Sequence, residues 1–150
     1  MFEQALAIYR ATGQASGVAS ALSNLGGISL RQGAYQQAIS YLRQALALFR
    51  QSGYQHGESV TLSWLAEALD ASGQPAAARA QLATALRLAA EAGGTYQQAR
   101  VHRRLAESHH RAGQDEQARH HWQQALTLYT QIDAPEADQV RRQLAAASRG

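Results

Sequence analysis

Apolar residues recur every three or four positions along most of the chain, which is the spacing of an amphipathic α-helix. The segment YQQAISYLRQALALF, residues 35–49, shows this well, because Ala38, Leu42, Leu46 and Phe49 fall on one helical face. Similar stretches follow one another, separated by short segments that contain glycine. No segment shows the alternation of apolar and polar residues that is typical of a strand. The pattern predicts an all-α protein.

The helical stretches repeat with a period of 40 residues. Gly33, Gly73 and Gly113 are separated by this step. Further columns with the same step are Gly13, Gly53 and Gly93; Ala38, Ala78 and Ala118; Ala5, Ala45, Ala85 and Ala125; and Leu25, Leu65 and Leu105. A fixed period of this size is typical of solenoid arrays, in which each unit packs on its neighbours. Two helical stretches fall within each period, so we interpret each repeat as a helical hairpin.

Glycine and proline place the ends of the predicted helices. Glycine suits a helix C-terminus because it adopts the left-handed conformation at little cost, and Pro75 and Pro135 suit the first turn of a helix. The predicted helices are 2–12, 16–32, 35–52, 56–72, 75–92, 95–112, 115–131 and 136–148. We therefore expect one array over residues 1–150: a truncated repeat at 1–12, full repeats at 16–52, 56–92 and 95–131, and a capping helix at 136–148.

The repeated positions resemble the signature of the tetratricopeptide repeat (TPR), which has a large residue, Leu-Gly, an aromatic residue, then Ala, a large residue and Ala. These positions hold Leu22, Leu25, Gly26, Ser29, Ala38, Leu42 and Ala45 in the first full repeat; Leu62, Leu65, Ala66, Leu69, Ala78, Leu82 and Ala85 in the second; and His102, Leu105, Ala106, His109, Ala118, Trp122 and Ala125 in the third. The unit is longer than the usual one and lacks the closing proline. In these respects it is similar to the repeats of spindle-orientation adaptors, kinesin light chains and bacterial signalling proteins.

This resemblance implies a right-handed α–α superhelix, a TPR solenoid of antiparallel helix pairs. It also implies that the small residue of each first helix, such as Gly26, approaches the alanine of the second helix, such as Ala38. The concave surface would be lined by the first helices and would bind a peptide or a segment of a partner protein. The residues that the resemblance places on this surface are Asn24, Arg31, Ser63, Trp64, Glu67, Arg100, Arg103, Arg104, His110, Arg111 and Arg142.

The third repeat makes the predicted groove strongly basic at one end. Arginine pairs with carboxylates through two parallel hydrogen bonds, so we expect an acidic partner segment, with Trp64 contacting an apolar residue of that segment. A structural explanation is equally open, since Arg103, Glu107 and Arg111 have the spacing of a solvated salt-bridge ladder. Binding of nucleic acid or another polyanion through the same arginines is the less favoured alternative, because no exposed aromatic residues are interleaved with them.

Five of the six histidines lie between residues 100 and 122. His102 and His109 occupy packing positions, with His102 expected opposite Trp122, whereas His120 and His121 are expected on the outer helix. The histidines lack the i, i+4 spacing of a helical zinc site, and the chain has no cysteine. Phosphate-binding loops and nucleophile motifs are absent from the sequence as well. We therefore predict no metal, no cofactor and no enzymatic activity.

Composition adds expectations about location and partners. All 14 basic residues are arginine, and the formal net charge is +3. The absence of a long apolar run predicts a protein that does not enter the membrane and stays in the cytoplasm. The arginine- and alanine-rich composition suggests a GC-rich bacterial source. The N-terminal end is expected to be poorly covered, which leaves association with a second copy of the chain through that end as an open alternative.

Overall fold

The computed structural model describes residues 3–4 and 15–149, and it describes side chains at 3–4 and 17–147. Its helices are α2 (Ala15–Arg31), α3 (Tyr35–Ser52), α4 (Gln55–Ala71), α5 (Pro75–Glu91), α6 (Thr95–Arg111), α7 (Asp115–Gln131) and α8 (Glu136–Arg149). The described part of the chain contains no strand, which confirms the predicted all-α fold class. The predicted helix 2–12 lies outside the described residues apart from positions 3 and 4, and with it lies the expected N-terminal self-association surface.

The junctions between helices have the backbone geometry that their glycines predict. Gly53 has a φ of 70°, and Gly33, Gly73, Gly93 and Gly113 are also left-handed. After α3, the amide of Gly53 donates to the Arg50 carbonyl and the amide of Tyr54 donates to the Phe49 carbonyl. These bonds satisfy carbonyl groups that have no partner inside the helix. Each predicted helix from 16 to 148 consequently ends within one residue of the described helix.

The turn between α7 and α8 keeps this geometry without a glycine. Asp133 lies 40 residues after Gly93 and has a φ of 56°. Its amide donates to the Thr130 carbonyl, and the amide of Ala134 donates to the Tyr129 carbonyl. Aspartate tolerates the left-handed region better than most residues with a side chain, although less well than glycine. The bond pattern of the junction, more than the glycine itself, is what the repeats share.

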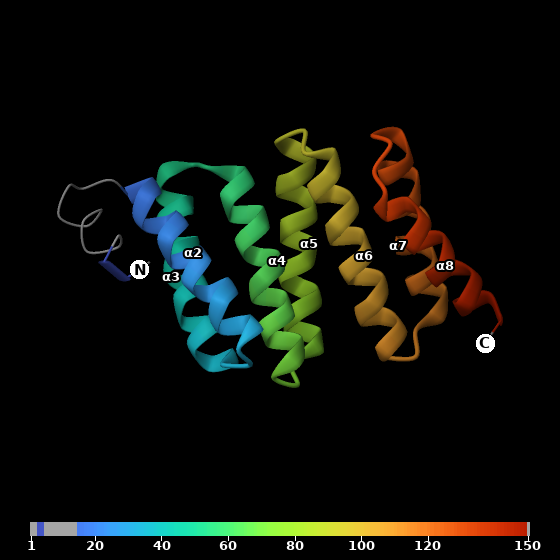
Figure 1. Ribbon diagram of the computed structural model, residues 1–150, viewed down its shortest axis with the longest axis horizontal. Helices are drawn as coiled ribbons and strands as arrows, with labels where there is room; N and C mark the ends of the chain where they lie inside the picture. Colours follow the sequence, from blue (N-terminus) through green and yellow to red (C-terminus); the bar gives the residue numbers. More distant parts are fainter. Residues whose placement is uncertain (1–2, 5–14, 150) are drawn as a thin grey trace. The chain divides into compact units, whose positions relative to one another are not determined.

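The chain divides into two compact units, Met1–Leu88 and Ala89–Gly150. In the N-terminal unit, α2 packs against α3, and α3 packs against α4 (Figure 1). The predicted close approach of α2 to α3 is present, because a Cβ atom added at Gly26 would lie 2.6 Å from Leu42. Two buried hydroxyl contacts add specificity: Ser23 Oγ lies 3.1 Å from Thr61 Oγ1, and Ser59 Oγ donates to the Ala85 carbonyl at 2.8 Å. This unit therefore holds α4 between α2 and α5.

The C-terminal unit packs α6 against α7 and α7 against α8. Trp122 and Tyr129 are the large residues of its core, at 4% and 0% exposure, and both belong to α7. The other members are small or β-branched: Ala99, Ala106, Ala118, Ala125, Ala137 and Val140. Small residues let the helix backbones approach closely, and the two aromatic rings then fill the remaining space. The last helix, α8, contributes Ala137 and Val140 to this core.

Candidate partner-binding site

Positive charge in the C-terminal unit is concentrated on α6. This helix carries four arginines and one glutamate, a formal charge of +3 with neutral histidines, whereas α7 carries Asp115, Glu116 and Arg119. Arg100, Arg103 and Arg104 are half-buried, and Arg111 is exposed. Burial lowers the pKa of Arg100, and the positive charge of Arg104 lowers it further. The sequence prediction of a basic helix therefore corresponds to a real concentration of mutually repelling charges.

Polar contacts fix α6 to the capping helix. Arg103 donates to Gln139 Oε1 at 3.2 Å and lies 3.7 Å from Glu107 Oε1, a partly exposed pair. At the start of α6, the Tyr96 hydroxyl donates to the Glu136 carboxylate. That hydrogen bond raises the pKa of Tyr96 and lowers the pKa of Glu136. One rung of the predicted salt-bridge ladder, Arg103 to Glu107, is thus present, and Arg103 has a positioning role besides its charge.

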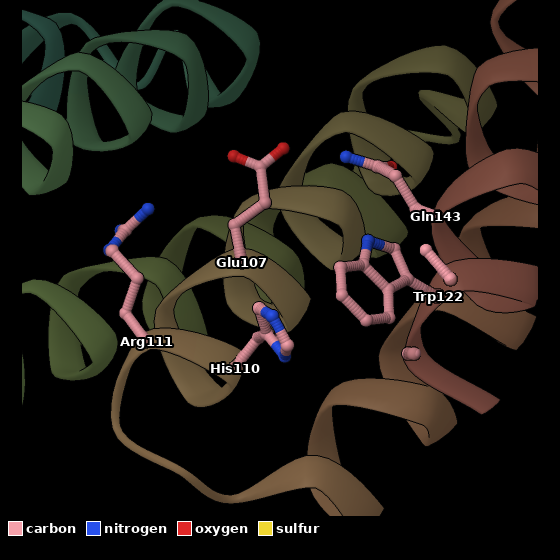
Figure 2. Close-up of a pocket in the computed structure, with 7 residues that line it drawn as sticks. Glu107, His110, Arg111, Trp122 and Gln143 are labelled. Carbon is pink, nitrogen blue, oxygen red and sulfur yellow. The ribbon is translucent and has the colours of Figure 1, made fainter. Parts of the chain in front are cut away.

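A pocket of about 290 Å³ opens between α6, α7 and α8, entirely within the C-terminal unit. Its lining combines a charged wall from α6 with an apolar floor and one carboxamide. The lining residues are Glu107, His110, Arg111, Trp122, Gln143, Ala146 and Ala147 (Figure 2). The ring of His110 lies 5.5 Å from that of Trp122, and His110 Nδ1 lies 3.2 Å from Asp115 Oδ1. The structure therefore brings together two of the predicted binding residues, His110 and Arg111.

The remaining predicted residue of this unit, Arg142, is exposed on α8 and does not line the pocket. In the N-terminal unit, Asn24 and Arg31 are exposed on α2, and Glu67 is exposed on α4. Each of these four side chains is therefore exposed, as a contact with a partner requires.

Ser63 does not lie on the surface as predicted, because it is only 1% exposed. It follows Ser59 by one helical turn, and Ser59 bonds to α5. Residues four apart share a helix face, so Ser63 also faces the interior of the N-terminal unit. The resemblance places this position on the concave surface, but here it is buried because α4 is covered on two sides. We remove Ser63 from the candidate residues.

Trp64 is half-buried and packs on α2. A Cβ atom added at Gly27 would lie 2.9 Å from Cζ3 of the Trp64 ring. The glycine therefore leaves the space into which the indole fits. Part of the ring remains exposed.

The histidines form a cluster between α6 and α7. His102 Nδ1 and His121 Nδ1 lie 2.9 Å apart, so one ring donates to the other. The rings of His109 and His121 are stacked at 5.4 Å, and His120 lies edge-on to His121. The expected half-buried position of His102 is correct, but its neighbour is His121, not Trp122 as predicted. Among the described residues, no group of three or more potential ligands has an arrangement that could hold a metal ion.

The histidine cluster predicts that stability decreases at mildly acidic pH. Burial, together with positive charge on neighbouring histidines, lowers the pKa of both His102 and His121 to about 4. The ordinary pKa is 6.5, so between pH 6.5 and 4 the unfolded chain binds more protons than the folded one. Stability is therefore lost as the pH falls through this window. We expect a loss of about 1–2 kcal/mol for the pair, after allowing for the partial exposure of the rings.

Thermal unfolding at about pH 7 and about pH 4.5 measures this effect. The double variant His102→Gln, His121→Gln serves as the control, because glutamine retains a hydrogen-bonding side chain that does not titrate. Its melting temperature should decrease less than that of the parent chain over this interval. Equal decreases in the two proteins would show that other groups carry the pH dependence.

Four pocket residues were missed by sequence reasoning. Trp122 was assigned to packing alone, and Gln143, Ala146 and Ala147 lie on a helix that was interpreted as a cap. The indole ring does pack in the core, but its edge also forms part of the pocket wall. The available indication of the pocket in the sequence was a tryptophan at a position that packs between helix pairs. Nothing distinguishes Gln143 from the other glutamines of the chain.

Comparisons with known proteins agree with the fold. A sequence model described as tetratricopeptide repeat matches residues 1–51, 17–91 and 57–131. The fold is similar to that of the apo form of RapI, with a TM-score of 0.81 and 16% identity over 87% of this chain and 48% of that chain. It is also similar to BtubC (BKLC) from P. vanneervenii, with a TM-score of 0.83 and 19% identity over 97% of this chain and 62% of that one.

A third similar structure contains the nearly identical TPR-like repeats of a protein described as a kinesin light chain from Podosopora anserina. The TM-score is 0.74, with 20% identity over 89% of this chain and 66% of that one. The chain thus spans about half to two thirds of the length of these structures. A comparison with curated protein sequences gives no significant match. The described helices include none that is long and apolar enough to cross a membrane.

Proposed function

Because the chain belongs to the tetratricopeptide repeat family, we propose that it is a non-catalytic interaction module that binds an acidic segment of a partner protein. Repeat arrays of this kind use extended surfaces to bind partners. The observation that carries the proposal is the concentration of four arginines against one glutamate on α6. Since the arginines repel one another, an anionic partner relieves an unfavourable interaction as well as adding new hydrogen bonds.

Two further features support a protein segment as the ligand. One of the α6 arginines, Arg111, lines a pocket with an apolar floor, which suits a chain with side chains better than a uniform polyanion. In the N-terminal unit, Trp64 is half-buried over Gly27 and leaves part of an aromatic ring exposed. Tryptophan often contributes strongly to binding energy, so Trp64 remains our proposed contact for an apolar residue of a partner. We also retain the proposal that residues 1–150 form one array, acting as a soluble regulatory scaffold.

Binding of a fluorescent peptide tests this function. The probe is a short peptide of Asp and Glu residues around one central leucine, followed by fluorescence anisotropy. Replacing Arg104 and Arg111 together by glutamine should weaken binding at least about tenfold at low salt, because each charge-assisted hydrogen bond is worth roughly 1.5–3 kcal/mol. The matched control is Arg119→Gln, which removes a half-buried arginine from α7 of the same unit. It should change the affinity by less than about twofold.

Nucleic-acid binding is the competing outcome. Single-stranded DNA of random sequence, measured in the same way, would then bind more tightly than the peptide, and its affinity would fall steeply with salt regardless of sequence. A peptide that binds the parent protein and the Arg104→Gln, Arg111→Gln variant equally well would contradict the role of α6.

A further inference from the structure

The pocket of the C-terminal unit contains a hydrogen-bond donor and an acceptor that the protein leaves unsatisfied. Trp122 is 96% buried, given its 4% exposure, and no described protein atom accepts a hydrogen bond from its Nε1. Likewise, no described atom donates to the buried Oε1 of Gln143. Burying a polar group without a partner costs about 1–3 kcal/mol, so most such groups in proteins are satisfied. Two of them lining one pocket indicate a bound group of complementary chemistry.

The two side chains line the same pocket. Figure 2 shows the indole nitrogen of Trp122 on the side where the carboxamide of Gln143 and the carboxylate of Glu107 lie. The rest of the floor is apolar, formed by the indole ring with Ala146 and Ala147. The pocket therefore offers one donor, at least two acceptors and an apolar surface. Its volume of about 290 Å³ is at the lower limit for a small-molecule site, and it suits a single side chain.

We propose that this pocket binds the primary carboxamide of a glutamine or asparagine side chain in the partner segment. The carboxamide oxygen accepts from Trp122 Nε1–H, and the NH₂ group donates to Gln143 Oε1 and toward Glu107. The apolar part of the side chain packs on the indole ring. This inference takes its partner from the proposed function, and the pocket shares Arg111 with the arginine surface, but it can be tested without any peptide.

Other side chains match the pocket less well. A carboxylate would accept from Trp122 and be attracted by Arg111. Beside Trp122, however, its charge would meet Gln143 Oε1 and Glu107, both acceptors. An ammonium or guanidinium group has donors only and would leave Trp122 Nε1 without a partner. An aliphatic side chain would leave both buried groups unsatisfied. A carboxamide also matches Gln143 in either orientation of that amide, since two amides can exchange a donor and an acceptor.

The test uses the full chain and propionamide as the probe. The indole N–H resonance of Trp122 is followed by NMR and is assigned by its loss in Trp122→Phe. We expect propionamide to shift this resonance downfield in a saturable manner, with a millimolar dissociation constant, because so few atoms make contact. The Trp64 resonance should stay unchanged. Propionate and butanone, which have the same size and no N–H donor, should bind at least about threefold more weakly.

The variant Gln143→Met supplies the second arm, because methionine retains the length of glutamine and removes its hydrogen bonds. It should weaken propionamide about threefold or more and leave butanone unchanged. If the three probes shift the Trp122 resonance equally, or if none does, the inference is wrong.

Peptides then separate this inference from the proposed function. The central leucine of the acidic peptide is replaced in turn by glutamine, glutamate and methionine. Tight but equal binding of the three peptides would overturn the carboxamide pocket and leave the α6 proposal intact. A propionamide response without any peptide binding would support the carboxamide pocket and contradict the α6 proposal.

Discussion

Replacing Trp122 by alanine is expected to lower the free energy of unfolding by about 3–5 kcal/mol. The indole is 4% exposed and lies in a core whose other members are mostly alanines. Alanine side chains have no rotamers through which they could move into the vacated volume, so the cavity stays open. The cost therefore includes both the lost apolar contacts and the cavity itself.

Urea unfolding followed by circular dichroism measures this cost. Trp122→Phe is the matched control, because phenylalanine fills most of the same space and should cost less than about 1.5 kcal/mol. An alanine variant that loses less than about 1 kcal/mol would show that the unit repacks around the gap, contrary to our description of its core.

The neighbouring glycines Gly26 and Gly27 are expected to respond in opposite ways to substitution by alanine. Each substitution gains up to about 1 kcal/mol of helix propensity in α2. At Gly26, however, the new Cβ would lie 2.6 Å from Cγ and Cδ2 of Leu42, which is fully buried and cannot move freely. We expect a net loss of about 1–2 kcal/mol for Gly26→Ala, since overpacking exceeds the gain.

At Gly27, the new Cβ would lie 2.9 Å from the far edge of the Trp64 ring, which is only half-buried. The ring can turn outward, so Gly27→Ala should be neutral or stabilising by about 0.5 kcal/mol. Thermal unfolding of the two variants gives the comparison, and Trp64 fluorescence should shift to longer wavelength only in Gly27→Ala. A loss of stability at Gly27 equal to that at Gly26 would mean that the indole is held as firmly as Leu42.

The fold could be predicted from sequence because its main determinants are local and repeated. Each junction needs one left-handed residue, and a glycine every 20 residues marks that need directly. The exception is Asp133, which keeps the same geometry without a glycine to mark it in the sequence. The close contact between Gly26 and α3 also follows from the pattern, because a small residue in this column is expected where two helices approach closely.

The candidate site was predicted less completely, because it depends on how three helices meet. His121 and Trp122 are adjacent and point about 100° apart on α7, so a small error in helix rotation exchanges the partner of His102. Serine is a residue type common on surfaces, and only the packing around α4 leaves Ser63 at 1% exposure. A pair of unsatisfied polar atoms on α7 and α8 indicates a ligand in the pocket. Whether a polar atom finds a hydrogen-bond partner depends on the folded structure and leaves no pattern in the sequence.

The common geometry of the junctions also has a consequence for the history of the chain. A segment that begins and ends at equivalent turns can be copied and inserted without requiring any new backbone conformation. Because Asp133 preserves the same bonds as Gly53, even a diverged junction remains a site at which a further unit could be joined. Lengthening by duplication thus leaves each hairpin's internal contacts intact, and the identical residues found 40 positions apart are the expected trace of such events.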